Sequence, residues 1–176
     1  MSATRTLLLG VLLDGPMHGY KVRQTLELWG ADRWASVAFG SIYHGLAQMA
    51  KEGLLDVVES GKGGQTVYAV TDAGRREFAR LLNDFWWDHK PIVDPFLVAL
   101  TFMDRMPGED LAAALTARRD RLRAELLMYE RGLAGKRDHG APRHVGETVI
   151  LSGLHVRAQL EWVEQAIGKL AEGELP

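Results

Sequence analysis

The strongest constraint on the fold is a short amphipathic helix that leads directly into a glycine-rich hairpin, within residues 38–71. Ile42, Leu46 and Met49 recur at four- and three-residue spacing, which is the pattern of a helix with one buried side. We therefore predict a helix over residues 40–52 with these three side chains directed into a core.

A hairpin is predicted immediately after this helix. Gly53 is suited to the left-handed conformation that ends a helix. Residues 54–59 and 66–70 have the composition of strands, and the glycine-rich stretch 61–64 supplies the turn between them. Winged-helix domains present this order of elements to DNA, with the helix in the major groove. We therefore expect a DNA-binding regulator rather than an enzyme.

Further helices are predicted on both sides of this segment. Residues 4–13 and 17–29 are expected to be helical, because each has an apolar side and is followed by glycine or proline. Another helix should begin at Thr71 or Asp72, whose side chains are suited to cap it, and should run to about Trp87.

The C-terminal half is also predicted to be helical. Asp94 and Pro95 are suited to start a helix over residues 96–103. Since this segment is apolar on nearly every side, we expect it to be buried. A longer helix should follow Pro107, with residues 134–144 as a polar loop. The apolar side of that longer helix carries Leu111, Leu115, Leu122, Leu126, Tyr129 and Leu133.

The last predicted helix, residues 145–172, has the heptad spacing of a coiled coil. We interpret its apolar stripe as a dimerisation surface, because two DNA half-sites about 34–36 Å apart require two DNA-binding domains held in a fixed relation. Packing against residues 111–133 of the same chain is the alternative. The candidate dimerisation residues are Val149, Val156, Leu160, Val163, Ile167 and Leu170.

Length and composition limit the other possibilities. A chain of 176 residues suits one domain or two small ones. We expect a mainly α protein with a small β-hairpin: a winged helix-turn-helix domain over 1–80 and a helical dimerisation region over 81–176. No stretch of about 18 apolar residues occurs, so we expect no membrane partner. The absence of cysteine suits a cytoplasmic protein.

The charge balance limits how the chain can bind DNA, and the motif content argues against catalytic, nucleotide-binding and metal-binding functions. Residues 1–90 hold ten Lys/Arg and ten Asp/Glu, so a basic DNA-binding face must be local and the salt dependence shallow. No Ser-His-Asp set, phosphate-binding loop or dinucleotide fingerprint occurs. His139 and His144 lack partners at metal-ligand spacing, and the cluster of Asp84, Asp88 and His89 at one helix end is more commonly exposed charge than a metal site. We therefore expect no catalysis, no cofactor and no metal site.

Several short motifs are spread over nearly the whole chain. The N-terminal half contains His18-Gly19-Tyr20, Gly40-Ser41-Ile42-Tyr43, Glu52-Gly53-Leu54-Leu55 and Tyr68-Ala69-Val70-Thr71-Asp72-Ala73-Gly74-Arg75. In combination these motifs resemble the PadR family of bacterial transcriptional regulators. Leu160-Glu161-Trp162-Val163 resembles the larger PadR subfamily, in which several C-terminal helices form the dimer.

The resemblance implies a homodimer that responds to an effector, binds a palindromic operator in double-stranded DNA and usually acts as a repressor. One departure concerns the turn of the hairpin, which is commonly rich in arginine in this family. Here residues 61–65 contain a single cation, Lys62. Together with the balanced charge, this favours one alternative function: a dimeric winged-helix interaction module with weak or no DNA binding.

The side of the helix over residues 40–52 that faces away from its buried stripe is available to DNA. A glutamine side chain can form two hydrogen bonds with adenine, and histidine or serine can donate to acceptors on other bases. Lysine is suited to contact phosphate. The alternative is a polar face that contacts only water. Tyr20 can also belong to the core. The candidate DNA-binding residues are Ser41, Tyr43, His44, Gln48 and Lys51 in this helix, Lys62, Gln65 and Thr66 in the hairpin, and Tyr20 and Lys21.

Aromatic residues in or next to the C-terminal half can line a pocket between subunits for a small aromatic or hydrophobic effector. Trp86, Trp87 and Trp162 are the candidates, with a plain structural role as the alternative. We expect the effector to change the spacing of the two DNA-reading helices, so that the dimer no longer fits successive major grooves.

Overall fold

The computed structural model describes three stretches of the chain: 3–60, 66–138 and 143–176. The chain forms two compact units, Met1–Pro91 and Ile92–Pro176. Residue 80, where we expected the domain boundary, lies inside a helix of the first unit. Because this helix belongs to the first unit as a whole, the boundary between the units lies beyond its C-terminal end, after Pro91.

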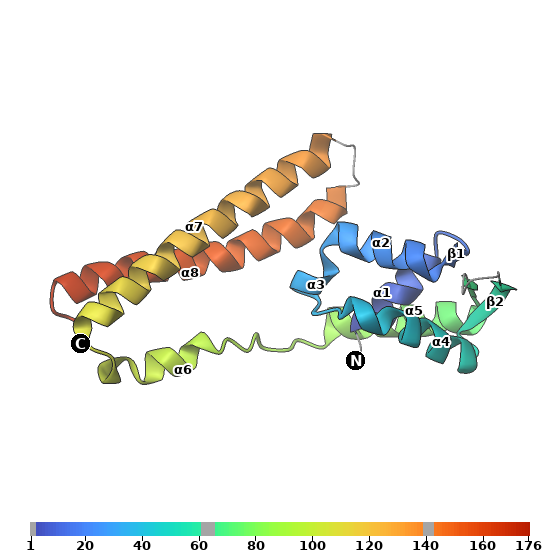
Figure 1. Cartoon of the computed structure of the whole chain (residues 1–176), viewed down its shortest axis with the longest axis horizontal. Coiled ribbons are helices and arrows are strands. Elements are labelled where there is room, and N and C mark those ends of the chain that lie inside the picture. Colours follow the sequence, from blue (N-terminus) through green and yellow to red (C-terminus); the bar gives the residue numbers. More distant parts are fainter. Residues whose placement is uncertain (1–2, 61–65, 139–142) are drawn as a thin grey trace. The chain divides into compact units, whose positions relative to one another are not determined.

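The first unit is mainly helical with a small sheet (Figure 1). A short 3-10 turn, Phe39–Ser41, precedes its fourth helix. The elements are α1 Ala3–Leu12, β1 Met17–His18, α2 Gly19–Trp29, α3 Ala31–Trp34, α4 Ile42–Lys51, β2 Leu55–Ser60, β3 Thr66–Val70 and α5 Asp72–Trp87. Each helix and strand that the sequence predicts in this unit is present, which confirms the mainly α fold with a β-hairpin.

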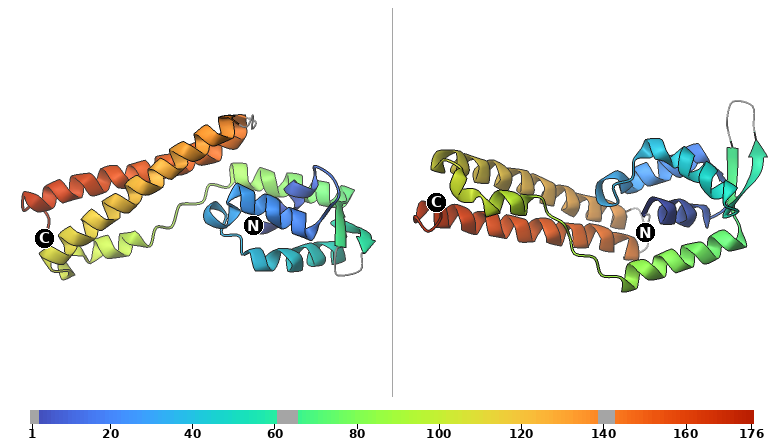
Figure 2. Two further views of the ribbon diagram at one scale, coloured as in Figure 1. Left: turned by 45° about the horizontal axis from the view of Figure 1, so that its top comes forward. Right: turned by 90° about the horizontal axis from the view of Figure 1, so that it is seen from below.

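β3 is the middle strand of an antiparallel sheet with the order β1-β3-β2. β2 and β3 form the predicted hairpin at one end of the unit (Figure 2). The third strand, β1, is not predicted by the sequence. Met17 pairs with Tyr68 across β1 and β3, so the first residues of the helix expected over 17–29 are extended and α2 begins at Gly19.

The core of the first unit places α4 against α1. Leu8 of α1 and Ile42 and Leu46 of α4 are completely buried, and Met49 nearly so. A Cβ at Gly45 would lie 2.9 Å from Cδ1 of Leu8, so glycine allows the two helices to approach closely. The predicted buried stripe of α4 is confirmed, and the opposite side of α4 remains exposed.

Thr71 joins α5 to the junction between α4 and the hairpin. Its Oγ1 accepts a hydrogen bond from the backbone N–H of Gly74 at 3.0 Å and donates one to the carbonyl oxygen of Gly53 at 2.8 Å. A Cβ at Gly74 would lie only 2.2 Å from the carbonyl oxygen of Leu54. The predicted cap is confirmed, and it fixes the end of α4 relative to the sheet.

The second unit is a long helical hairpin preceded by a short helix (Figure 1). α7 continues to Asp138, so the polar loop expected over 134–144 begins later than predicted. No proline occurs in this stretch before Pro142, and the helix therefore has no reason to end earlier. The elements are α6 Phe96–Thr101, a 3-10 turn Met103–Arg105, α7 Gly108–Asp138, a 3-10 turn Arg143–Gly146, and α8 Glu147–Ala171.

α7 and α8 lie antiparallel and side by side (Figures 1 and 2). Leu122 of α7 forms a buried cluster with Val156, Leu160 and Val163 of α8. The other three candidate dimerisation residues are half-buried: Val149, Ile167 and Leu170. The heptad stripe therefore packs within one chain, which is the alternative that its spacing leaves open, because α7 is long enough to cover it.

α6 is not the buried helix that we expected. Leu97, Val98 and Phe102 are 58%, 63% and 60% exposed. The ring of Phe96 is half-buried and contacts Trp162 of α8 edge-on, with 5.7 Å between ring centroids. A short helix presents one side to the α7–α8 hairpin, so its other apolar sides are left uncovered within a single chain.

Candidate nucleic-acid interface

α4 presents an exposed, mostly polar surface away from its buried stripe. Ser41, Tyr43, His44, Gln48 and Lys51 are all exposed. The structure thus brings together the five residues that we predict for DNA contact in this helix and its first turn. Their side chains include donors and acceptors suited to base edges and one cation suited to phosphate.

The first turn of α2 lies next to α4. A Cβ at Gly19 would lie 3.2 Å from ring atoms of Tyr43, so glycine lets the start of α2 approach this ring. Tyr20 and Lys21 are both exposed at the same helix end. The residue at the N-cap, His18, makes no capping hydrogen bond with any described residue. Backbone N–H groups at such an end can bind a phosphate.

Tyr20 does not belong to the core, which the sequence leaves as an alternative. Its side chain is 62% exposed, and its hydroxyl accepts a hydrogen bond from Nε2 of Gln24 at 3.0 Å. Val22 and Leu26 occupy the inward positions of α2 instead. The helical spacing therefore leaves Tyr20 on the solvent side, beside Lys21.

Arg23 is a cation of this surface that the sequence does not single out. Its Nε lies 2.7 Å from Oε1 of Glu27. The hydrogen bond with Glu27 raises the pKa of Arg23, and Tyr43 of α4 adds a smaller contribution. Arg23 lies four residues after Gly19, one helical turn into α2, and this spacing is the signal that could have identified it.

The hairpin candidates are only partly described. Lys62 and Gln65 lie outside the described residues. Thr66 is half-buried at the start of β3 and is paired with Ser60 in the register of the hairpin. Contact between these three residues and DNA stays a prediction.

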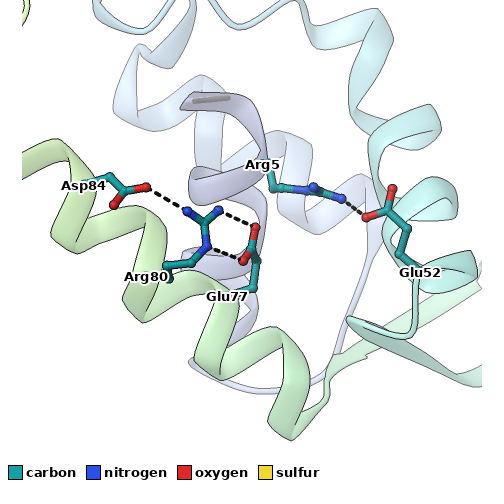
Figure 3. Close-up of polar contacts among 5 residues, drawn as sticks. All are labelled: Arg5, Glu52, Glu77, Arg80 and Asp84. Atoms are coloured by element: carbon teal, nitrogen blue, oxygen red, sulfur yellow. Dashed lines mark hydrogen bonds and ion pairs between the residues drawn. The ribbon is translucent and has the colours of Figure 1, made fainter. Parts of the chain in front are cut away.

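A chain of polar contacts links α1 to the exposed side of α4. Nε2 of Gln48 donates a hydrogen bond to Oε1 of Glu52 at 2.9 Å. The other carboxylate oxygen of Glu52 pairs with the guanidinium of Arg5 from α1, as Figure 3 shows. We call these residues the Arg5–Glu52–Gln48 chain. The same figure shows a separate ion-pair group within α5, made by Arg80 with Glu77 and Asp84.

An apolar groove of about 960 Å³ lies in the second unit, between the α6 segment and α7. Phe96, Val98 and Phe102 line it from the α6 segment, and Leu115 and Arg118 line it from α7. The guanidinium of Arg118 lies 3.4 Å from the ring centroid of Phe96, and its Nη2 donates to Oε1 of Gln159 at 2.9 Å. Its Nε is buried and has no hydrogen-bond partner among the described residues. The groove thus combines an apolar lining with a cation at its wall.

The three tryptophans predicted for an effector pocket belong to different units, and their role in such a pocket stays a prediction. Trp86 and Trp87 are each 80% exposed on α5 of the first unit. Trp162 belongs to the second unit, where it is half-buried against Phe96. Trp162 therefore packs against Phe96, which lines the groove, but does not line the groove itself. The sequence misses the groove because it forms only when the α6 segment packs beside α7.

The described part of the chain lacks two features. No helix there is both long and apolar enough to cross a membrane. No group of three or more histidines, aspartates and glutamates there could hold a metal ion.

Two family models match the chain, one in each unit. The model of the transcriptional regulator PadR-like family matches residues 8–80, and the model named virulence activator alpha C-term matches residues 93–171. No curated protein matches the chain. The first model covers α4 and the hairpin, and the second covers the long helices.

Solved structures share the fold over nearly the whole chain. The PadR-like transcriptional regulator BC1756 from Bacillus cereus has a TM-score of 0.77 at 21% identity, covering 97% of this chain and 99% of its own. Bacillus subtilis PadR in complex with operator DNA has a TM-score of 0.74 at 19% identity, covering 94% and 98%. The same protein in complex with p-coumaric acid has a TM-score of 0.76 at 18% identity, covering 97% and 98%.

These likenesses extend over both units, in the same order along the chain, and they agree with the motifs that the sequence contains. The two family models account for the helix followed by a hairpin and for the helical region after it. The chain belongs to the PadR-like family of transcriptional regulators.

Proposed function

We propose that this chain binds double-stranded DNA in a sequence-specific manner as a homodimer and represses transcription in the cytoplasm. The observation that carries this proposal is the exposed polar surface of α4, next to the uncapped first turn of α2. Ser41, His44 and Gln48 would reach base edges, whereas Lys21 and Lys51 would contact phosphates. A similar fold has been solved with operator DNA in Bacillus subtilis PadR, which supports the proposal.

The homodimer accounts for the uncovered apolar side chains of the second unit. Leu97, Val98 and Phe102 near α6 and Leu151 and Leu154 on α8 are all more than half exposed. Apolar surface that remains uncovered on a single chain is typical of a subunit interface. A second copy of the second unit would bury it and hold two α4 helices at the distance of two half-sites.

We place the effector in the groove beside α6. Its apolar lining suits a small aromatic or hydrophobic molecule, and Arg118 would meet an acidic group on that molecule. The structure of Bacillus subtilis PadR with p-coumaric acid supports an effector of this class. A second copy over α6 would close the groove, so that binding there changes the spacing of the two α4 helices.

The experiment is a fluorescence-anisotropy titration of the full chain against the DNA upstream of its own gene, with scrambled DNA as control and at two salt concentrations. We expect tight binding to the upstream DNA by a dimer, weaker binding to scrambled DNA, and a moderate loss of affinity at the higher salt. Equal and weak binding to both DNAs, together with a genomic pull-down that enriches no fragment, would contradict the proposal.

The balanced charge of residues 1–90 favours a second candidate, a dimeric interaction module with weak or no DNA binding. The two candidate functions predict different effects of His44→Ala and Gln48→Ala on operator binding. A regulator loses operator binding and keeps its dimer. An interaction module has no operator to lose, so the pull-down recovers proteins and no preferred DNA.

A further inference from the structure

The Arg5–Glu52–Gln48 chain determines which atoms of the Gln48 amide are available to a base. An ionised carboxylate only accepts hydrogen bonds, so the side of Gln48 that faces Glu52 must be its NH₂ group. One N–H of Gln48 is therefore occupied. Its carbonyl oxygen and its second N–H remain free to bind another partner.

We infer that Glu52, held by Arg5, is a positioning residue that sets the amide orientation of Gln48 and so directs Gln48 to adenine. This inference rests on the proposed DNA-binding function. Adenine presents the N6 amino group as a donor next to N7 as an acceptor in the major groove. One amide oxygen and one N–H match that pair, whereas the reversed amide would present two N–H donors.

Arg5 has two effects in this arrangement. It fixes the carboxylate of Glu52 from the neighbouring helix (Figure 3), while the other carboxylate oxygen accepts the hydrogen bond from Gln48. It also offsets the negative charge that Glu52 would otherwise present close to the phosphates of bound DNA. The side chains of Arg5 and Glu52 are 30% and 36% exposed, so both are partly shielded from water.

A structural role alone is the competing explanation. Glu52 lies at the end of α4, and its ion pair with Arg5 joins α4 to α1. Loss of such a contact lowers stability and weakens the affinity for every DNA sequence alike. Only a positioning role changes the preference at one base pair in each half-site, and base preference is therefore the quantity to measure.

The test is a selection of binding sites from random double-stranded DNA by the purified full chain. Gln48→Ala identifies the base pair that Gln48 contacts, since its variant loses the adenine preference there. We expect Glu52→Ala to lose that same preference, about ten-fold or more, and to keep the rest of the motif. The double variant Gln48→Ala/Glu52→Ala should select the same motif as Gln48→Ala alone.

Glu52→Gln provides a sharper test and preserves the size of the side chain. Arg5 donates to the carbonyl oxygen of the new amide, which leaves its NH₂ group facing Gln48. The Gln48 amide must then turn its own oxygen toward position 52 and present two N–H donors outward. Guanine offers two acceptors, N7 and O6, so we expect the preference at this base pair to shift from adenine to guanine.

Asp84→Ala is the matched control, because it breaks an ion pair with Arg80 within α5 of the same unit. Thermal unfolding of each variant confirms that it is folded. The positioning role is contradicted if the wild type selects a motif with an adenine preference and both Glu52 variants keep that preference. A wild-type chain that selects no motif contradicts the proposed function, and the inference with it.

Discussion

At the scale of single residues, the joint between α4, the hairpin and α5 depends on two small side chains. Thr71 hydrogen-bonds both the first turn of α5 and the carbonyl oxygen of Gly53. Gly74 lets α5 pass against the backbone of Leu54. These contacts set the direction in which the hairpin leaves α4, so they affect the surface that we propose contacts DNA, although they do not belong to it.

Gly74→Ala should destabilise the first unit by about 2 kcal/mol or more, because the new Cβ would overlap the carbonyl oxygen of Leu54, which is backbone and cannot turn away. Urea unfolding measures the change. Gly168→Ala in α8 is the control: its Cβ would meet no atom within 4 Å, so we expect a gain of about 0.5–1 kcal/mol from helix propensity. An unchanged midpoint for Gly74→Ala would contradict the close packing.

Glu77 gives the stability of the first unit a dependence on pH. The hydrogen bond from Arg80 lowers the pKa of Glu77 below its ordinary value. A carboxyl group with a lowered folded-state pKa stabilises the fold above its unfolded-state pKa, and this contribution disappears as the pH falls through the folded-state pKa.

We therefore expect Glu77→Gln to lower the urea midpoint slightly at pH 7, with a difference from the wild type that vanishes as the pH falls below about 4. Glu59→Gln, at an exposed position of β2, is the control and should leave the midpoint nearly unchanged. A difference for Glu77→Gln that stays constant from pH 7 to pH 3 would show that the ion pair is not its cause.

At the scale of helices and strands, the sequence predicts elements well where local patterns determine them. The stripe of Ile42, Leu46 and Met49 predicts α4, and Thr71 predicts the start of α5, because spacing and capping are local properties. β1 escapes prediction because two residues form a strand only through pairing with β3, which lies far along the chain. The Arg5–Glu52 contact is missed for the same reason, since it joins two helices.

The C-terminal helices show a second limit of prediction. The heptad spacing of α8 correctly predicts an apolar stripe, but the same spacing serves packing within one chain and packing between two chains. In the structure Val156, Leu160 and Val163 pack on α7. Exposed apolar residues lie near α6, where the sequence led us to expect burial, as well as at Leu151 and Leu154 of α8, and the groove lies beside α6.

The α6 segment should therefore carry much of the dimer interface. Phe102→Glu places a charge on its exposed apolar side, and we expect it to raise the dimer dissociation constant about ten-fold or more. Sedimentation velocity over a concentration series measures this. Leu28→Glu, at an exposed position of α2, is the control and should leave the dimer intact. Equal dissociation constants for both variants would place the interface elsewhere.

At the scale of the whole molecule, the two units have separable tasks in this account. We propose that the first unit presents α4 and the start of α2 to DNA, and that the second supplies the apolar surface for a second copy and a groove for an effector. A change on the exposed surface of α4 should therefore alter DNA binding and leave dimerisation unaffected.

The most direct test of the account is an anisotropy titration of the double variant His44→Ala/Gln48→Ala against the operator that the wild type selects. We predict a loss of affinity of at least about ten-fold, with an unchanged sedimentation coefficient for the dimer and with Lys169→Ala on α8 binding like the wild type. Wild-type affinity of the double variant for the operator would contradict the claim that α4 reads the DNA sequence.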